Sequence, residues 1–250
     1  ILKKDNYDIV QLEMVYMAPY IETIRENSDA MIVLRAHNVE HLIWDRIAKK
    51  TKFPPKKWYI NHLVRTLKKY ELDVINKVDG IAAITYRDAA FFRGETSVPV
   101  IDIPFGVNPE EFTPSYEVKE NPTLYHIGSM NWMPNEEGIR WFLKNVWEKL
   151  KEREPDIKLN LAGRHMPKWL MNLKKKNVKV WGEVPDAKEF IKNNDIAIVP
   201  LLSGSGIRIK IIESMAMGKT VITTMIGAEG IQYSEYNNII IADNPTKIVE

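Results

Sequence analysis

The residues best suited to chemistry in this chain lie in one segment, VPLLSGSGIRIKIIESMAMGKTVITT, which covers residues 199–224. A glycine and serine loop, two cations and a carboxylate follow one another there: Gly204, Ser205, Gly206, Arg208, Lys210 and Glu213. Backbone N–H groups and the dipole at a helix start favour a phosphate, and the two cations add positive charge. Glu213 would lie about two turns further along the helix, roughly 10 Å at ~1.5 Å per residue, with its side chain leaning back toward the helix start. A phosphate site followed by a carboxylate that can accept two hydroxyls predicts a site for a nucleotide diphosphate.

Two common phosphate-binding motifs do not fit this segment. Ile209 stands where GxGxxG needs its last glycine, and Glu213 stands where a Walker A loop needs its first. The Gly-Lys-Thr at residues 218–220 also leads into a predicted strand instead of a helix. A simpler alternative stays open, in which a glycine turn precedes a surface helix that carries an ion pair between Lys210 and Glu213.

The same segment is similar to the donor-site motif of retaining glycosyltransferases with the GT-B fold, which use nucleotide-diphosphate sugars. Further segments follow the family's order within residues 124–230, namely LYHIGSMNWMPNEEGIRWF, IKLNLAGR, VKVWGEVPD and IGAEG. Upstream, VQLEMVYMAPY, MIVLRAHNVEHLIW and GIAAITYRDAAFF resemble the family's acceptor-side domain. The resemblance implies a hexosyltransferase-like enzyme that retains the anomeric configuration.

The resemblance also implies further donor contacts. The loop after the first strand of the family's donor domain holds the pyrophosphate, and here it contains Gly128 and Ser129. The loop around Val184 corresponds to the one that holds the nucleobase through backbone groups. Gly227 and Glu229 lie in a loop that would present backbone N–H groups or a carboxylate to sugar hydroxyls, or would form a simple turn.

Two positions depart from the family pattern. Ser205 stands where the family usually has the first of two glutamates. The sequence Gly-Ser-Met-Asn at residues 128–131 occupies a loop that usually carries an Arg and then a Lys, with Asn135 following shortly after. The charge of the diphosphate would then fall to Arg208, Lys210 and the helix start.

Candidate catalytic residues lie in the first half of the chain. Glu13 and His37 each end a predicted strand, and two polar side chains at adjacent strand ends suit acceptor binding or proton transfer. The resemblance implies that His37 faces the donor sugar, whereas the structural alternative is a capping or core-edge histidine. Residues 37–41, HNVEH, also match the HxxEH motif of a class of zinc peptidases. That motif needs both histidines on one helix face, and the predicted strand MIVLRA before His37 argues against it.

Composition narrows the class of protein. The 250 residues include no cysteine, and 35 Lys and Arg balance 33 Asp and Glu, so we expect no nucleic-acid partner, no disulfide and no thiolate zinc site. No DxD motif occurs, so we expect cationic side chains to neutralise the diphosphate without a metal or another cofactor. No apolar run is long enough to span a bilayer, so we expect a cytoplasmic protein.

Strand-like runs alternate with helical periodicity along the chain, which predicts parallel βαβ units. We expect an α/β protein with two Rossmann-like, doubly wound, parallel-sheet domains that face a cleft. The predicted parts are a partial acceptor-side domain at residues 1–104, a proline-rich linker at 105–121 and a donor-binding domain at 122–250. The chain starts on Ile1 and ends on Glu250, and we expect both domains to be truncated.

The stretch PPKKWYINHLVRTLKKYELDVINKV, residues 54–78, is amphipathic and basic. It would lie on an anionic membrane surface at the inner face of the membrane and reach a lipid-linked acceptor. Alternatively, it would pack onto its own domain and keep its lysines in solvent.

The predicted function is transfer of a sugar from a nucleotide-diphosphate sugar to a carbohydrate or glycolipid acceptor, in glycan or polysaccharide biosynthesis. Two alternatives stay open. One is a nucleotide-sugar epimerase or hydrolase, and the other is a non-catalytic family member that only binds the nucleotide sugar.

Overall fold

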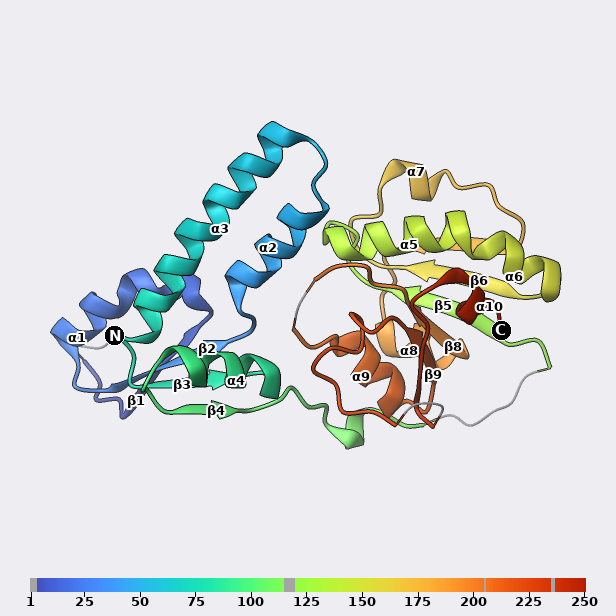
Figure 1. Ribbon diagram of the computed structural model, residues 1–250. Coiled ribbons are helices and arrows are strands. Elements are labelled where there is room, and N and C mark those ends of the chain that lie inside the picture. Colours follow the sequence, from blue (N-terminus) through green and yellow to red (C-terminus); the bar gives the residue numbers. More distant parts are fainter. Residues whose placement is uncertain (1–3, 115–119, 205, 235–236) are drawn as a thin grey trace. The chain divides into compact units, whose positions relative to one another are not determined.

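The computed structural model describes residues 4–114, 120–204, 206–234 and 237–250 (Figure 1). The chain divides into two compact units, one of Ile1–Phe105 with Gly204–Ile207 and one of Gly106–Ser203 with Arg208–Glu250. Each unit holds one sheet, of 4 and 6 strands respectively, and the strands pair in parallel throughout. The predicted α/β class with two parallel Rossmann-like sheets is confirmed.

The first sheet has its strands in chain order: β1 (Ile9–Glu13), β2 (Met31–Ala36), β3 (Gly80–Ala83) and β4 (Val100–Asp102). The intervening helices are η1 (Val15–Tyr20, 3-10), α1 (Ile21–Asn27), α2 (Glu40–Lys50), α3 (Pro54–Ile75) and α4 (Tyr86–Glu95). One core cluster joins strands and helices through side chains such as Leu34, Ile75 and Phe92, all almost completely buried. Glu13 is opposite Arg35 in the register of β1 with β2, so the carboxyl ends of these strands lie side by side.

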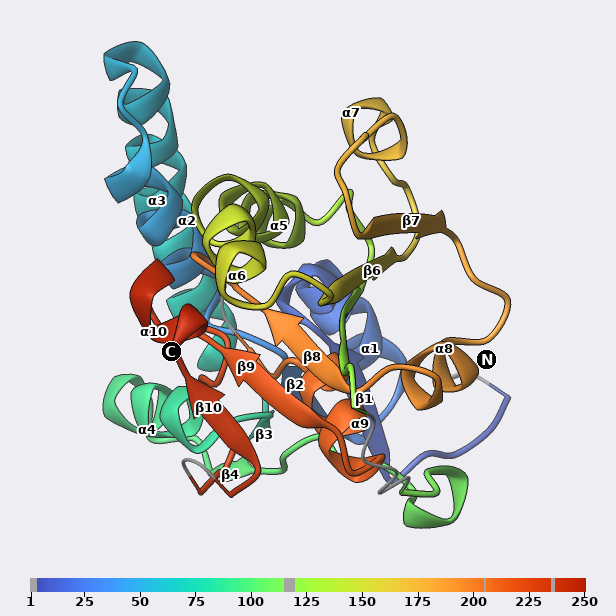
Figure 2. The same cartoon turned by 90° about the vertical axis from the view of Figure 1, so that its right-hand side faces the viewer.

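The second sheet contains β5 (Thr123–Ile127), β6 (Lys158–Ala162), β7 (Val178–Gly182), β8 (Ile196–Val199), β9 (Thr220–Thr223) and β10 (Ile239–Ile241). Figure 2 shows their spatial order, β10-β9-β8-β5-β6-β7. The chain starts in the middle at β5, runs outward through β6 and β7, and then returns to continue on the other side through β8, β9 and β10. This is the strand order of a doubly wound dinucleotide-binding fold.

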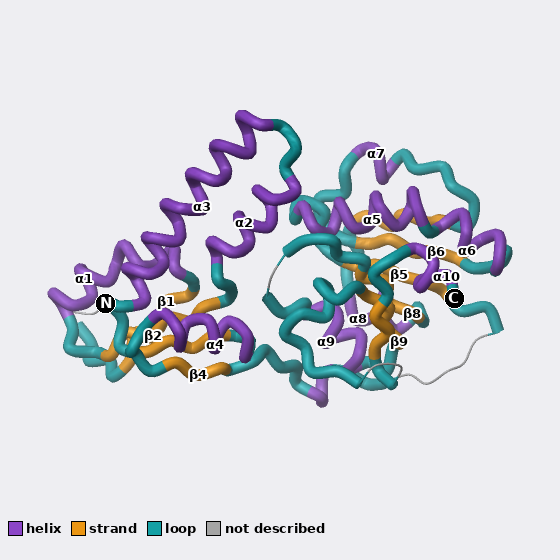
Figure 3. The backbone as a smooth tube through the Cα atoms, in the orientation of Figure 1, coloured by secondary structure: helices purple, strands orange, loops and turns teal. Residues whose placement is uncertain are grey.

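Helices cover both faces of the second sheet (Figure 3). They are α5 (Met133–Asn145), α6 (Trp147–Arg153), α7 (Lys168–Met171), α8 (Ala187–Lys192), α9 (Ile209–Ala216) and α10 (Pro245–Val249), and a 3-10 turn, η2 (Pro109–Glu111), precedes β5. Adjacent residues of β5 point to opposite faces, because side chains alternate along a strand. Leu124 packs with Phe142 and Trp147 on the α5 and α6 face, and Tyr125 packs with Ile211 on the α8 and α9 face.

Among the described residues, no helix combines the length and the apolar composition needed to cross a bilayer.

Candidate functional site

The second sheet reverses its winding between β5 and β8. Ligands of open parallel sheets bind outside the carboxyl ends of the strands at such a switch point. Gly128 and Ser129 directly follow β5, and the loop that leads to α9 directly follows β8. The predicted donor-site residues, which are far apart in the chain, therefore lie on the two segments that border the switch point.

Lys210 joins these two segments. Its Nζ donates a hydrogen bond to Oδ1 of Asn135 at 2.7 Å, and Nδ2 of Asn135 donates to the carbonyl oxygen of Ser129 at 2.8 Å. Gly128 lies against the same ammonium group, because a Cβ on this residue would lie 2.4 Å from Lys210 Nζ. The structure therefore brings Gly128, Ser129 and Lys210 together, with the buried Asn135 as the link.

The electrostatics of this cluster favour an anion. Burial of the ammonium group, together with the nearby charge of Arg208, lowers the pKa of Lys210 to about 7, and the charge of Glu213 acts in the opposite direction. Burial raises the pKa of Glu213, against the charges of Lys188 and Lys210. A phosphate beside Lys210 would offset both the loss of solvent and the repulsion by Arg208.

Helix α9 follows the glycine loop and carries Lys210 and Glu213, as the sequence predicts. It begins at Ile209 with Arg208 as its N-cap. Gly204 and Gly206 have φ angles of +108° and +79°, which a right-handed helix cannot contain. These glycines therefore lie outside the helix, and Glu213 lies about 6 Å along the axis from the first helical residue, at ~1.5 Å per residue, instead of the expected ~10 Å. Ser205 lies outside the described residues.

Two aromatic residues that the sequence did not single out help to position α9. Tyr125 is almost fully buried, and its hydroxyl donates a hydrogen bond to Ser214 Oγ at 2.8 Å. Ser214 Oγ in turn donates to the backbone oxygen of Lys210 at 2.6 Å, so the helix is tied to β5. The guanidinium of Arg208 lies over the ring of Trp132, with its Cζ atom 5.4 Å from the ring centroid, in a cation–π contact. Buried aromatic residues on strands are common, so no feature of the sequence distinguishes Tyr125 from them.

Gly163 is a further position that the sequence did not reveal. Its φ is +144°, and a Cβ there would lie 1.8 Å from the carbonyl oxygen of Gly128. Its N–H donates to the oxygen of Gly182 at 2.7 Å, while the N–H of Gly128 donates to Ala162 at 3.1 Å. The ends of β5, β6 and β7 therefore pack so closely that only glycine fits at position 163. The one sequence feature that points to this position is the Ala-Gly-Arg at the end of a predicted strand.

The remaining donor candidates lie at other strand ends of the second unit. Val184 follows β7 at the sheet edge and is partly buried against the α8 and α9 face. Gly227 lies in the turn after β9, where its N–H donates to Thr224 Oγ1 at 3.0 Å and a Cβ would lie 2.0 Å from Thr223 Oγ1. Close packing of a turn thus explains this glycine, and Glu229 is a partly buried member of the same turn.

In the first unit, Glu13 and His37 are in direct contact. Glu13 Oε2 and His37 Nε2 lie 2.7 Å apart, and both side chains are substantially exposed. The hydrogen bond from His37 is the largest influence that lowers the pKa of Glu13, with Gln11 acting in the same direction and burial opposing it. A carboxylate that holds an imidazole in this way can take part in proton transfer or in orienting a hydroxyl.

Met14, the residue after Glu13, has a φ of +71°, which is unusual for a residue with a side chain. This conformation turns the chain into η1.

His41 belongs to a different cluster. Its Nδ1 lies 2.5 Å from Oε2 of Glu71, and both side chains are almost fully buried. His37 precedes α2 whereas His41 lies within it, so the two histidines have separate carboxylate partners and do not form the HxxEH arrangement on one helix. In the part of the chain that the structure describes, no three His, Cys, Asp or Glu side chains are grouped so that they could hold a metal ion.

Comparisons with known proteins agree with this architecture. A curated relative, described as an uncharacterized 44.6 kDa protein in the cps region of Klebsiella pneumoniae, is 23% identical over 256 residues, which cover 97% of this chain and 63% of the relative. The chain thus spans less than two thirds of that protein's length.

Solved structures share the fold at low sequence identity. TarM matches with a TM-score of 0.71 at 15% identity, over 96% of this chain and 46% of its own. Sucrose-phosphate synthase from Thermosynechococcus elongatus matches with a TM-score of 0.70 at 14% identity, over 97% of this chain and 63% of its own. HepE from Anabaena, solved in complex with UDP-glucose, matches with a TM-score of 0.68 at 14% identity, over 97% of this chain and 67% of its own.

The family model described as "Glycosyl transferases group 1" matches residues 121–250, which is more than half of the chain and includes the whole second sheet. The matched region contains the cluster of Gly128, Asn135 and Lys210 at the switch point. The chain therefore belongs to the glycosyl transferases group 1 family.

Proposed function

We propose that this chain acts in a glycosyltransferase that moves a sugar from a nucleotide-diphosphate sugar to a carbohydrate or lipid-linked acceptor, with retention of configuration. Membership of the family supports the reaction class, and the relative from a cps region supports a role in polysaccharide biosynthesis. HepE was solved with UDP-glucose, which makes uridine nucleotides the first donors to test.

The observation that carries this proposal is the contact between Lys210, Asn135 and the loop of Gly128 and Ser129. In the proposed complex the diphosphate lies at this loop, and Lys210 and Arg208 neutralise it without a metal. Oxygen atoms of a departing diphosphate gain negative charge as the bond to the sugar breaks, so fixed cations lower the barrier of that step.

The other donor contacts follow from the same placement. Glu213 accepts the ribose hydroxyls, backbone groups near Val184 hold the base, and the turn with Gly227 and Glu229 contacts the sugar. The partial burial of Glu213 strengthens such hydrogen bonds, because water competes less for its carboxylate.

We assign Glu13 and His37 to the reacting sugars. Their mutual hydrogen bond holds the imidazole in one orientation, which suits contact with a sugar hydroxyl. No nucleophilic carboxylate is needed if the acceptor oxygen attacks on the face from which the diphosphate leaves. In that step the new glycosidic bond forms as the bond to the diphosphate breaks, and the acceptor's proton passes to the released diphosphate.

Titration of uridine, UDP and UDP-glucose by calorimetry tests the donor assignment. Glu213→Ala should weaken all three ligands by at least tenfold, because it removes charge-assisted hydrogen bonds worth ~1.5–3 kcal/mol each, with ~1.4 kcal/mol per decade of affinity. Glu213→Gln should fall between this variant and the unsubstituted chain. Lys210→Ala and Arg208→Ala should weaken UDP much more than uridine, since they interact with charge.

Matched controls are Glu189→Ala and Lys168→Ala, which remove exposed groups on α8 and α7. Both should bind all three ligands normally. Unchanged affinities in Glu213→Ala would contradict the ribose assignment. Release of free glucose from UDP-glucose at the same rate with and without acceptors would favour a hydrolase over a transferase.

A further inference from the structure

The positive charge of this protein is concentrated in one short segment. Residues 46–70 contain nine Lys and Arg and no Asp or Glu, whereas the other 225 residues carry 26 Lys and Arg against 33 Asp and Glu. The net charge of the whole chain is small because a strongly basic segment offsets the acidic excess of the other residues. Such an asymmetry indicates an anionic partner for the segment.

The structure folds this segment into the hairpin of α2 and α3, which projects from its unit (Figure 1). The hairpin tip, residues 52–59, comprises the end of the connecting loop and the first six residues of α3, and every residue in it is exposed. A helix that packs against its own domain buries one stripe of side chains. The first turns of α3 bury none, although residues further along, such as Ile60 and Glu71, are buried.

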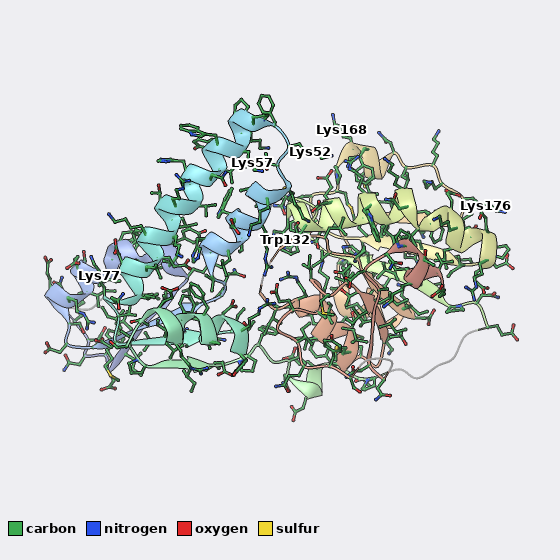
Figure 4. All side chains as sticks on the ribbon, viewed as in Figure 1. Lys52, Lys57, Lys77, Trp132, Lys168 and Lys176 are labelled. Carbon is green, nitrogen blue, oxygen red and sulfur yellow. The ribbon has the colours of Figure 1, made fainter. Side chains whose placement is uncertain are left out.

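Large aromatic side chains lie on this exposed tip. Trp58 is 72% exposed, Phe53 64% and Tyr59 56%. Lys52 precedes Phe53, and Lys56 and Lys57 precede Trp58 and Tyr59. Among the described residues no acidic side chain forms an ion pair with these three lysines. Figure 4 shows Lys52 and Lys57 at this end of the hairpin.

Exposed aromatic rings beside lysines on a projecting hairpin are suited to the boundary between water and lipid. Trp and Tyr are enriched at the level of the lipid headgroups, and lysines near them are attracted by anionic lipids. An apolar groove of about 400 Å³ lies on the same hairpin, between η1 and the two helices, and is lined by Tyr16, Trp44, Leu63, Thr66, Leu67 and Tyr70.

We propose that the hairpin tip docks on an anionic lipid surface. The lysines make the first contact with the headgroups, and Phe53, Trp58 and Tyr59 then enter the interface. The proposal does not depend on sugar transfer, because the tip contains none of the residues assigned to the donor or to the reacting sugars.

Co-sedimentation with lipid vesicles tests it directly. The 250-residue chain should bind vesicles of phosphatidylcholine that contain one third phosphatidylglycerol, and should bind pure phosphatidylcholine at least tenfold more weakly. Binding should also fall as salt rises above about 0.1 M, where the screening length is ~10 Å and shortens further. The triple variant Lys52→Gln, Lys56→Gln and Lys57→Gln should bind at least tenfold more weakly, since each lysine near an anionic surface contributes about fivefold.

Two matched controls test whether the loss of vesicle binding is specific to the lysines and aromatic residues of the hairpin tip. Lys168→Gln, Lys174→Gln and Lys176→Gln remove three exposed lysines of the second unit and should leave vesicle binding unchanged. Trp58→Ala should weaken binding, whereas Tyr86→Ala, which removes an equally exposed aromatic side chain at the start of α4, should not. Equal loss in both triple variants would overturn the proposal, as would equal binding to neutral and anionic vesicles. Tight binding to single-stranded oligonucleotides without binding to vesicles would assign the segment to nucleic acid instead.

Discussion

Lys210 shows how a single side chain can couple proton and ligand binding. Burial and Arg208 hold its pKa at about 7, against an ordinary value of 10.5, so above that pH most of the free protein carries a neutral Lys210. A diphosphate beside it favours the charged form and raises the pKa, which means that binding takes up a proton. We therefore expect the affinity for UDP to fall as the pH rises above about 7.

Calorimetry in buffers with different ionisation enthalpies measures this proton uptake. The terminal phosphate of UDP titrates near pH ~6, so measurements above pH 7 isolate the contribution of the protein. Lys210→Met should bind UDP weakly and with an affinity that hardly changes over the same pH range. A variant that kept the full pH dependence would show that another group takes up the proton.

At the scale of residues, the sequence predicted part of the candidate site. Lys210 could be selected because its type and position suggest phosphate chemistry, and Gly128 and Ser129 could be selected through the family resemblance. The three residues do lie together. Asn135 and Gly163 could not be selected, because their roles depend on contacts between segments that only the folded chain brings together. The same holds for the partner of His41, which is 30 residues away in the sequence.

At the scale of elements, α2 depends on a carboxylate from α3. Its N-cap residue, Val39, has no side chain that could accept a hydrogen bond, so the backbone N–H of Glu40 donates instead to Glu71 at 2.9 Å. Glu71 also contacts Nδ1 of His41 and is 1% exposed. This helix start follows His37 closely, so Glu71 also fixes the segment that carries the candidate catalytic histidine.

Loss of this buried carboxylate should destabilise the first unit strongly. Glu71→Ala leaves a backbone donor and His41 buried without their acceptor, and breaking a buried pair of this kind costs about 3–5 kcal/mol in the free energy of unfolding. Urea denaturation followed by circular dichroism measures the change. Glu26→Ala, which removes an exposed glutamate of α1, should change the free energy by no more than about 0.5 kcal/mol. Similar curves for the two variants would contradict the capping role.

Two glycines provide a second comparison at this scale. Gly163→Ala needs an unfavourable φ and places a Cβ against the carbonyl of Gly128, so we expect lower stability and weaker UDP binding. Gly94 lies in α4, and an added Cβ there would meet no atom within 4 Å. Gly94→Ala should therefore stabilise the protein by about 0.4–1 kcal/mol through the entropy of the unfolded chain. Thermal unfolding with and without UDP distinguishes the two variants, and normal UDP binding by Gly163→Ala would argue against the close packing of the β5 and β6 ends.

The elements themselves were largely predictable, because hydrophobic runs of four to six residues alternate with helical periodicity. The predicted strand MIVLRA is β2, and the amphipathic stretch of residues 54–78 contains the long helix α3. The order of glycine loop and helix was predictable, but the first residue of α9 was not, because glycines before a helix can either join its first turn or adopt left-handed conformations, as Gly204 and Gly206 do.

At the scale of the whole molecule, two parallel sheets follow from the alternation of strands and helices, but the order of the strands does not. A right-handed crossover satisfies chain geometry on either side of β5, and only tertiary packing decided that β8 returns to its other side. That return creates the switch point, where the predicted loop of Gly128 and the predicted helix of Lys210 come into contact.

The two units should respond differently to a nucleotide. UDP at ~100 times its dissociation constant should stabilise the protein that binds it by about 2.7 kcal/mol. Since Gly128, Arg208, Lys210 and Glu213 belong to the second unit, we expect hydrogen exchange to slow mainly at the ends of β5 and β8 and in α9. Exchange in the first sheet should change little, and Lys210→Met at the same UDP concentration should show little protection in either unit. Equal protection of β1 to β4 and of the second sheet would contradict this assignment, because it would require the diphosphate or ribose to be held by the first unit as well.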